Sequence, residues 1–133
     1  MGVACSLATD NFASWQEGLS KLRDRFENAI LASIPNVTVN GDPLSRLPHI
    51  TNLAFSGVDN DGLLTMLPEL VASTGSACHI SDFAPSHVLE ALGKKPSVSE
   101  CSLRFGFGKD NSINEVDIAV KLICDAVNRQ RES

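Results

Sequence analysis

Two long amphipathic segments, one near each end of the sequence, most constrain how this chain folds. From Asn11 to Ser33, apolar residues recur every three or four positions, at Trp15, Leu19, Leu22, Phe26 and Ile30. The other side of this segment is polar, with Glu17, Lys21, Asp24, Glu27 and Asn28. This spacing predicts a helix that buries one stripe. Residues 112–115 have the Ser-x-x-Glu spacing of a capping box, which predicts a second helix with the stripe Val116, Ala119 with Val120, Ile123 and Val127.

The segments between these helices are short. Alternating or β-branched patterns predict strands over 37–39, 50–55 and 101–107, and apolar clusters predict short helices over 61–70 and 86–92. Residues 72–81 are small or polar and favour a loop. We therefore expect an α/β fold of two layers (α+β), in which helices cover a small mixed or mostly antiparallel sheet.

Length, composition and charge indicate one ordinary globular domain that comprises residues 1–133. The chain has 43% hydrophobic and 20% charged residues, a mixture too apolar for disorder. Its formal charge of -5 and its lack of a basic run make nucleic acid and anionic membranes poor partners. No apolar stretch approaches the roughly 20 residues of a membrane span, and no signal peptide is recognisable. We expect a soluble chain.

The four cysteines indicate a reducing, cytosol-like compartment, because no two have the C-x-x-C spacing and the domain is large enough to fold without disulfides. Cys5, Cys101 and Cys124 lie among small or apolar residues, so we interpret them as structural. Cys78 differs, because it lies in the polar segment 73–81. It is the candidate reactive thiol, and an inert surface thiol is the alternative.

The sequence offers two further candidates for a functional site, an arginine on a strand and a set of cysteine and histidine residues. Arg104 falls on the strand face opposite Leu103 and Phe105, where a rigidly held guanidinium can bind a carboxylate, although a solvated arginine has the same pattern. Cys78, His79 and His87 have irregular spacing and no fourth partner, so we expect no metal site.

Several motifs in order along the chain resemble one protein family. Gly2–Ala8 and Leu22-Arg23-Asp24-Arg25 are followed by Asn40-Gly41-Asp42, Arg46-Leu47-Pro48-His49 and Asn52, then by Thr74-Gly75-Ser76-Ala77-Cys78, Pro85-Ser86-His87-Val88-Leu89 with Gly93, and Leu103-Arg104-Phe105 with Gly108. Together they are similar to the C-terminal small domain of the NifS/IscS-type cysteine desulfurases. These enzymes are class V members of the pyridoxal-phosphate (PLP) aminotransferase superfamily, and the selenocysteine lyases are close relatives.

The resemblance implies a fold, a reaction and roles for two residues. The fold would be that of the small domain of fold-type I PLP enzymes. The reaction would convert L-cysteine to L-alanine and leave a persulfide on Cys78, while Arg104 binds the substrate carboxylate. The family also implies a homodimer, a cytoplasmic location and a sulfur-acceptor partner, either an iron-sulfur cluster scaffold or a tRNA-thiolation protein.

One departure from the family limits what this chain does alone. The cofactor lysine of the family lies in a Ser-x-His-Lys context, which none of the lysines here has: Lys21, Lys94, Lys95, Lys109 and Lys121. We therefore expect that the PLP-binding large domain is absent from this chain, that the chain has no cofactor-binding residues, and that it is inactive alone. A freestanding sulfur carrier, an inactive remnant domain and a preference for selenocysteine are the alternatives.

Overall fold

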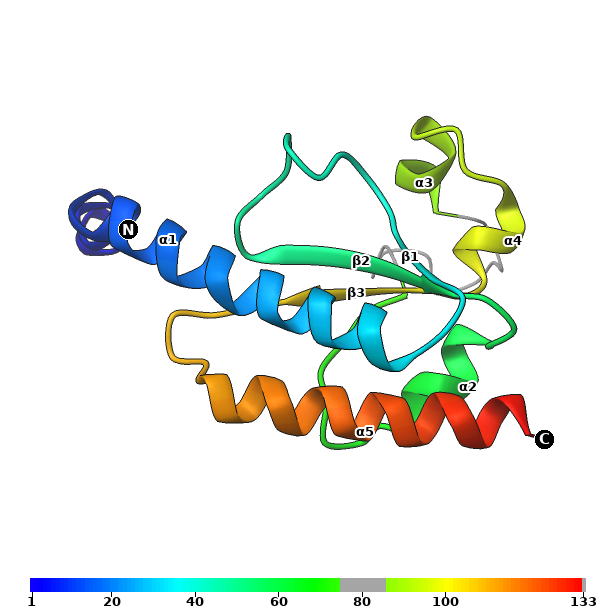
Figure 1. The fold of residues 1–133 in the computed structure, drawn as a ribbon. Coiled ribbons are helices and arrows are strands. Elements are labelled where there is room, and N and C mark those ends of the chain that lie inside the picture. The colour runs from blue at the N-terminus through cyan, green and yellow to red at the C-terminus, as the bar shows by residue number, and fades with distance from the viewer. Residues whose placement is uncertain (75–85, 133) are drawn as a thin grey trace.

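The structure, a computed structural model, describes residues 1–74 and 86–132. Cys78, His79 and most of the segment expected to be a loop lie outside the described residues. In chain order the elements are α1 (Gly2–Ser33), β1 (Val37–Val39), β2 (Ile50–Phe55), α2 (Asn60–Thr65), α3 (His87–Ala91), α4 (Pro96–Ser99), β3 (Ser102–Gly106) and α5 (Ile113–Arg131) (Figure 1).

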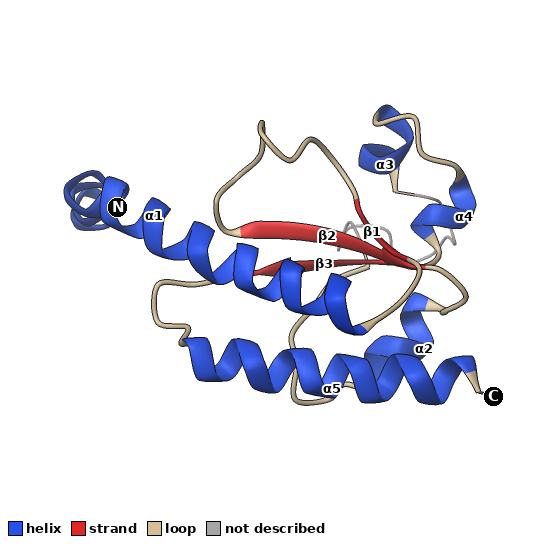
Figure 2. Ribbon diagram, viewed as in Figure 1, coloured by secondary structure: helices blue, strands red, loops and turns tan. Residues whose placement is uncertain are grey.

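A three-stranded antiparallel sheet in the order β1-β2-β3 forms one layer (Figure 2). Leu53 in the central strand lies opposite Val39 on one side and Leu103 on the other. Helices α1 and α5 form the second layer and run side by side, joined by an ion pair of 2.8 Å between Arg25 and Asp117. The predicted α+β two-layer fold with a small, mostly antiparallel sheet is confirmed.

The core lies between the sheet and these two helices. Its members come from the predicted stripes and from alternate strand positions: Phe26, Ile30, Leu53, Phe55, Leu103, Phe105, Ile123 and Val127. The rings of Phe26 and Phe105 lie 4.9 Å apart, centroid to centroid. This contact ties α1 to β3, the strand that carries Arg104.

Several element boundaries differ from the predicted ones. Helix α1 begins at Gly2, and its first nine residues (2–10) are all exposed. Because they bury no side chains, no apolar stripe indicated this part of the helix. Helix α2 ends at Thr65, because Pro68 would clash with the carbonyl of Leu64 one turn earlier. The predicted capping box is confirmed: the Ser112 hydroxyl accepts from the Glu115 N–H, and the Glu115 carboxylate accepts from the Ser112 N–H.

Helices α3 and α4 lie at one end of the sheet, away from the N-terminal end of α1 (Figure 1). Ser86 caps α3, and Gly93 after it has the positive φ of +73° that favours glycine. Helix α4 was not predicted, because four residues are too few to display a helical period. No helix in the described part of the chain could span a membrane.

Candidate functional site

A cleft of about 440 Å³ lies over the sheet and contains Arg104. The strand residues Asn52 and Arg104 in its lining alternate with core residues, so the cleft occupies the sheet face opposite α1 and α5. We call it the Arg104 cleft. It is lined by Asn40, Arg46, Ile50, Thr51, Asn52, Thr74, Ser86, His87, Val88, Leu89, Leu92 and Arg104.

Arg104 projects from a strand whose neighbouring side chains anchor it. Leu103 is fully buried and Phe105 nearly so, whereas Arg104 is exposed, as its place in the alternation predicted. The backbone of Arg104 forms two hydrogen bonds with Ser73, one donated to the Ser73 carbonyl (2.7 Å) and one accepted from its N–H (3.1 Å). Arg104 Nη2 also donates to Ser73 Oγ at 3.4 Å. Core packing and backbone pairing therefore fix the base of this side chain.

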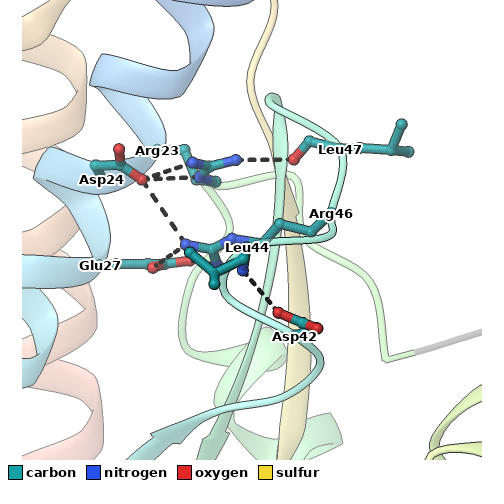
Figure 3. A network of polar contacts seen from close by, with 7 residues as sticks. All are labelled: Arg23, Asp24, Glu27, Asp42, Leu44, Arg46 and Leu47. Atoms are coloured by element: carbon teal, nitrogen blue, oxygen red, sulfur yellow. Dashed lines mark hydrogen bonds and ion pairs between the residues drawn. The ribbon is translucent and has the colours of Figure 1, made fainter.

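A second arginine, Arg46, forms part of the cleft wall and is held by acidic residues of α1 (Figure 3). Arg46 donates to both carboxylate oxygens of Glu27, with Nη2 at 2.9 Å from Oε2, and lies 3.8 Å from Asp24. Arg23 bridges Asp24 and the carbonyl of Leu47, which is 2.9 Å away. The hydrogen bond to Glu27 raises the pKa of Arg46 above its ordinary value. This network ties the loop between β1 and β2 to α1.

The network corrects the sequence interpretation of α1. Glu27 was placed on the polar side of the helix, opposite the apolar stripe, but only 6% of Glu27 is exposed. Glu27 is buried because Arg46, nineteen residues later, neutralises its carboxylate with two hydrogen bonds. Glu27 follows Arg23 by four positions on the same helix, and this spacing could have indicated a polar cluster. It gave no sign that Arg46 in the loop would be the partner of Glu27.

Removing this carboxylate is expected to destabilise the fold. Glu27→Ala leaves the guanidinium of Arg46 half-buried without its main partner, and we expect a loss of about 3 kcal/mol in the free energy of unfolding. Glu17→Ala is the matched control, because Glu17 pairs with Lys21 in solvent on the same helix, and an exposed ion pair adds little to stability. Urea unfolding of the three proteins measures both values. Equal losses in the two variants would contradict the buried-pair account.

The cysteines of the described residues are in different settings. Cys101 and Cys124 are partly buried, and burial raises the pKa of both thiols. Both remain structural in interpretation, since a raised pKa lowers the fraction of reactive thiolate. Cys5 is exposed, which corrects the expectation that it packs inside, because the first turns of α1 extend beyond the core. Cys78 lies outside the described residues.

Other site predictions concern metals and basic groups. Within 1–74 and 86–132, no three His, Cys, Asp or Glu side chains gather closely enough to hold a metal ion. His87 is exposed and lines the Arg104 cleft. The sequence analysis named Asn40 and Asn52 only as parts of motifs and gave neither a role, yet both line the cleft beside Arg104.

Comparison with known proteins decides the family. The model of the family described as aminotransferase class-V matches residues 6–119. The chain belongs to the aminotransferase class-V family. Over 99% of its length it is 37% identical to "Cysteine desulfurase IscS" of Pseudomonas putida strain W619 and 36% identical to "Cysteine desulfurase" of Rattus norvegicus. It spans 32% and 29% of those two proteins, so it corresponds to about a third of either one.

A solved structure confirms the fold of this class-V chain. The NifS-like protein of Rickettsia africae superimposes on 96% of the chain and on 33% of its own length, with a TM-score of 0.81 and 22% identity. The resemblance to the NifS/IscS-type group seen in the sequence motifs is therefore confirmed for both sequence and fold.

PLP is the cofactor of this class-V family, but the Arg104 cleft does not fit the group on its own. Its described lining supplies the guanidinium of Arg104, a second guanidinium already paired with Glu27, two side-chain amides, hydroxyls and an imidazole. It has no lysine amine that could bond covalently to an aldehyde. This donor set suits a carboxylate. The described residues of the cleft therefore include no group that could attach the cofactor covalently.

Proposed function

We propose that residues 1–133 form the C-terminal small domain of a PLP-dependent cysteine desulfurase and that a large domain outside this chain binds the cofactor. The observation that carries the proposal is an exposed Arg104 in a cleft of a chain that matches cysteine desulfurases over 99% of its length. In this proposal the chain binds and orients L-cysteine and accepts its sulfur, while the cofactor supplies the chemistry that weakens the carbon-sulfur bond.

Arg104 is proposed to bind the carboxylate of L-cysteine. Among the described residues, Arg23, Arg25 and Arg46 each pair with an acidic side chain, whereas no carboxylate lies within ion-pair distance of Arg104. An unneutralised guanidinium in a cleft attracts an anion and can hold a carboxylate by two parallel hydrogen bonds. The position of Arg104 on a packed strand supports a fixed orientation for the substrate.

Cys78 is proposed to accept the substrate sulfur as a persulfide. Thr74 and Ser86, which flank the segment that contains Cys78, both line the Arg104 cleft. The segment that contains the thiol is therefore flanked on both sides by residues of the cleft. The alternative of a freestanding sulfur carrier needs the thiol but gives no role to an exposed arginine in a cleft, so we favour the desulfurase.

The wider context is proposed from the family alone. It comprises a homodimer, a cytoplasmic location, and transfer of sulfur to an iron-sulfur scaffold or a tRNA-thiolation protein. Selenocysteine is the alternative substrate.

A chimera tests the proposal. This chain replaces the matching third of Pseudomonas putida IscS, and alanine formation from L-cysteine and from selenocysteine is measured in the purified, PLP-coloured protein. We expect the chimera to form alanine and the 133-residue chain alone to form none. A coloured chimera that forms no alanine while its parent does, or activity of the chain alone, would refute the proposal.

A further inference from the structure

A fixed chain of hydrogen bonds crosses the sheet beside Arg104. The Ser102 hydroxyl donates to the carbonyl of Val98, so its oxygen accepts the bond of 3.0 Å from Asn40 Nδ2. The same Asn40 Nδ2 donates to Asn52 Oδ1 at 2.7 Å. Because an amide oxygen only accepts and an amide nitrogen only donates, these bonds set the orientation of both amides.

The opposite orientation of Asn40 is unfavourable. Asn40 Oδ1 is buried and has no hydrogen-bond partner among the described residues. Exchanging the oxygen and nitrogen would place two unsatisfied N–H donors at that buried position, and it would set an oxygen against the lone pairs of Ser102 Oγ. The side-chain carbonyl of Asn52 therefore accepts from Asn40, and the NH₂ group of Asn52 points elsewhere and can donate to another partner.

Asn52 and Arg104 are direct neighbours across the sheet. They are paired in register on β2 and β3, so their side chains share one face. Both backbone polar groups of Arg104 bond to Ser73 and so point away from β2, which makes Asn52 and Arg104 a non-hydrogen-bonded pair. In such pairs the Cα atoms are only about 4.5 Å apart and the side chains are closest. Both residues line the cleft.

We propose that Asn52 is a second carboxylate-binding residue, whose Nδ2 donates to the same carboxylate that Arg104 holds. The inference rests on the proposed function, since it takes Arg104 to bind the carboxylate of an α-amino acid. A carboxylate has about four acceptor sites, of which a guanidinium fork occupies two. A neutral amide adds a donor without repelling the arginine. Nδ2 of Asn52 has no partner among the described residues, and it is not enclosed, so it is accessible from the cleft.

The test is an NMR titration of the isotope-labelled 133-residue chain with L-alanine, and with L-alaninamide as the probe that lacks a carboxylate. We expect L-alanine to shift the side-chain NH₂ signals of Asn52 together with the guanidinium signals of Arg104, and L-alaninamide to shift neither. Asn52→Asp keeps the bond from Asn40 but replaces the donor by a negative charge that pairs with Arg104. We expect it to weaken L-alanine binding about 10-fold or more. Asn128→Asp is the matched control, because it adds the same charge to an exposed position on α5.

Two results separate this inference from the proposed function. If Arg104→Gln abolishes L-alanine binding but Asn52→Asp binds like the unaltered chain, or the Asn52 signals do not respond, the role of Asn52 is refuted and that of Arg104 stands. If Arg104→Gln leaves binding unchanged, both roles are refuted. A merely structural Asn52 would not distinguish a carboxylate from a carboxamide.

Discussion

Cys78→Ser in the chimera is expected to lower alanine formation from L-cysteine by about 10³-fold or more, the scale of losing a catalytic nucleophile. A hydroxyl is a far weaker nucleophile than a thiolate and cannot store sulfur as a persulfide. The variant should keep its bound PLP, because in the proposal the large domain binds the cofactor and Cys78 lies outside that domain. The measurement is alanine release at fixed substrate, with the cofactor colour as the test of folding.

Cys5→Ser is the matched control for this variant. Cys5 is exposed, so it is accessible to reagents. It lies in the first turns of α1, at the end of the molecule away from α3 (Figure 1), and α3 contributes residues to the cleft. We expect Cys5→Ser to leave the rate unchanged. Undiminished activity of Cys78→Ser would refute the role of Cys78 as sulfur acceptor.

Chain connectivity supports the choice of Cys78 over the other thiols. Cys78 follows the cleft residue Thr74 by four positions, and four extended residues span at most about 14 Å. Cys101 and Cys124 are partly buried with raised pKa values, so the fraction of each in the thiolate form is lowered at neutral pH. Of the four cysteines in the sequence, only Cys78 both lies close in sequence to a cleft residue and belongs to a polar segment.

Arg104→Gln in the same chimera is expected to lower kcat/KM for L-cysteine about 100-fold. Two charge-assisted hydrogen bonds to a carboxylate are together worth about 3 kcal/mol, which corresponds to that factor. Arg104→Lys should recover only part of the loss, since a single ammonium cannot bind both carboxylate oxygens in parallel. Steady-state kinetics on coloured, folded protein provides the measurement.

The control for Arg104 removes a positive charge elsewhere. Lys121 is exposed on α5, the helix on the opposite side of the sheet, so Lys121→Gln changes the net charge equally without touching the cleft. We expect it to leave kcat/KM unchanged. Equal losses in both variants would indicate a general charge effect and would contradict specific binding by Arg104.

The fold was largely predictable because its elements follow local patterns. The apolar stripes of α1 and α5, the capping box at Ser112 and the alternation around Arg104 each depend on residues within a few positions of one another. These patterns determine which faces are buried, and those faces supply most of the observed core. Short or exposed elements such as α4 and the first turns of α1 leave no such pattern.

The surroundings of the candidate site were not predictable, because they depend on partners far apart in sequence. Glu27 becomes buried only because a loop brings Arg46 to it, and Asn40 meets Ser102 across sixty-two positions. Hydrogen bonds of this kind are made by single side chains with no repeat in the sequence. The sequence by itself therefore determined the elements, the exposed face of Arg104 and the family likeness. Only the tertiary structure decided which polar groups surround that arginine, because burial and hydrogen-bond partners arise when distant segments pack together.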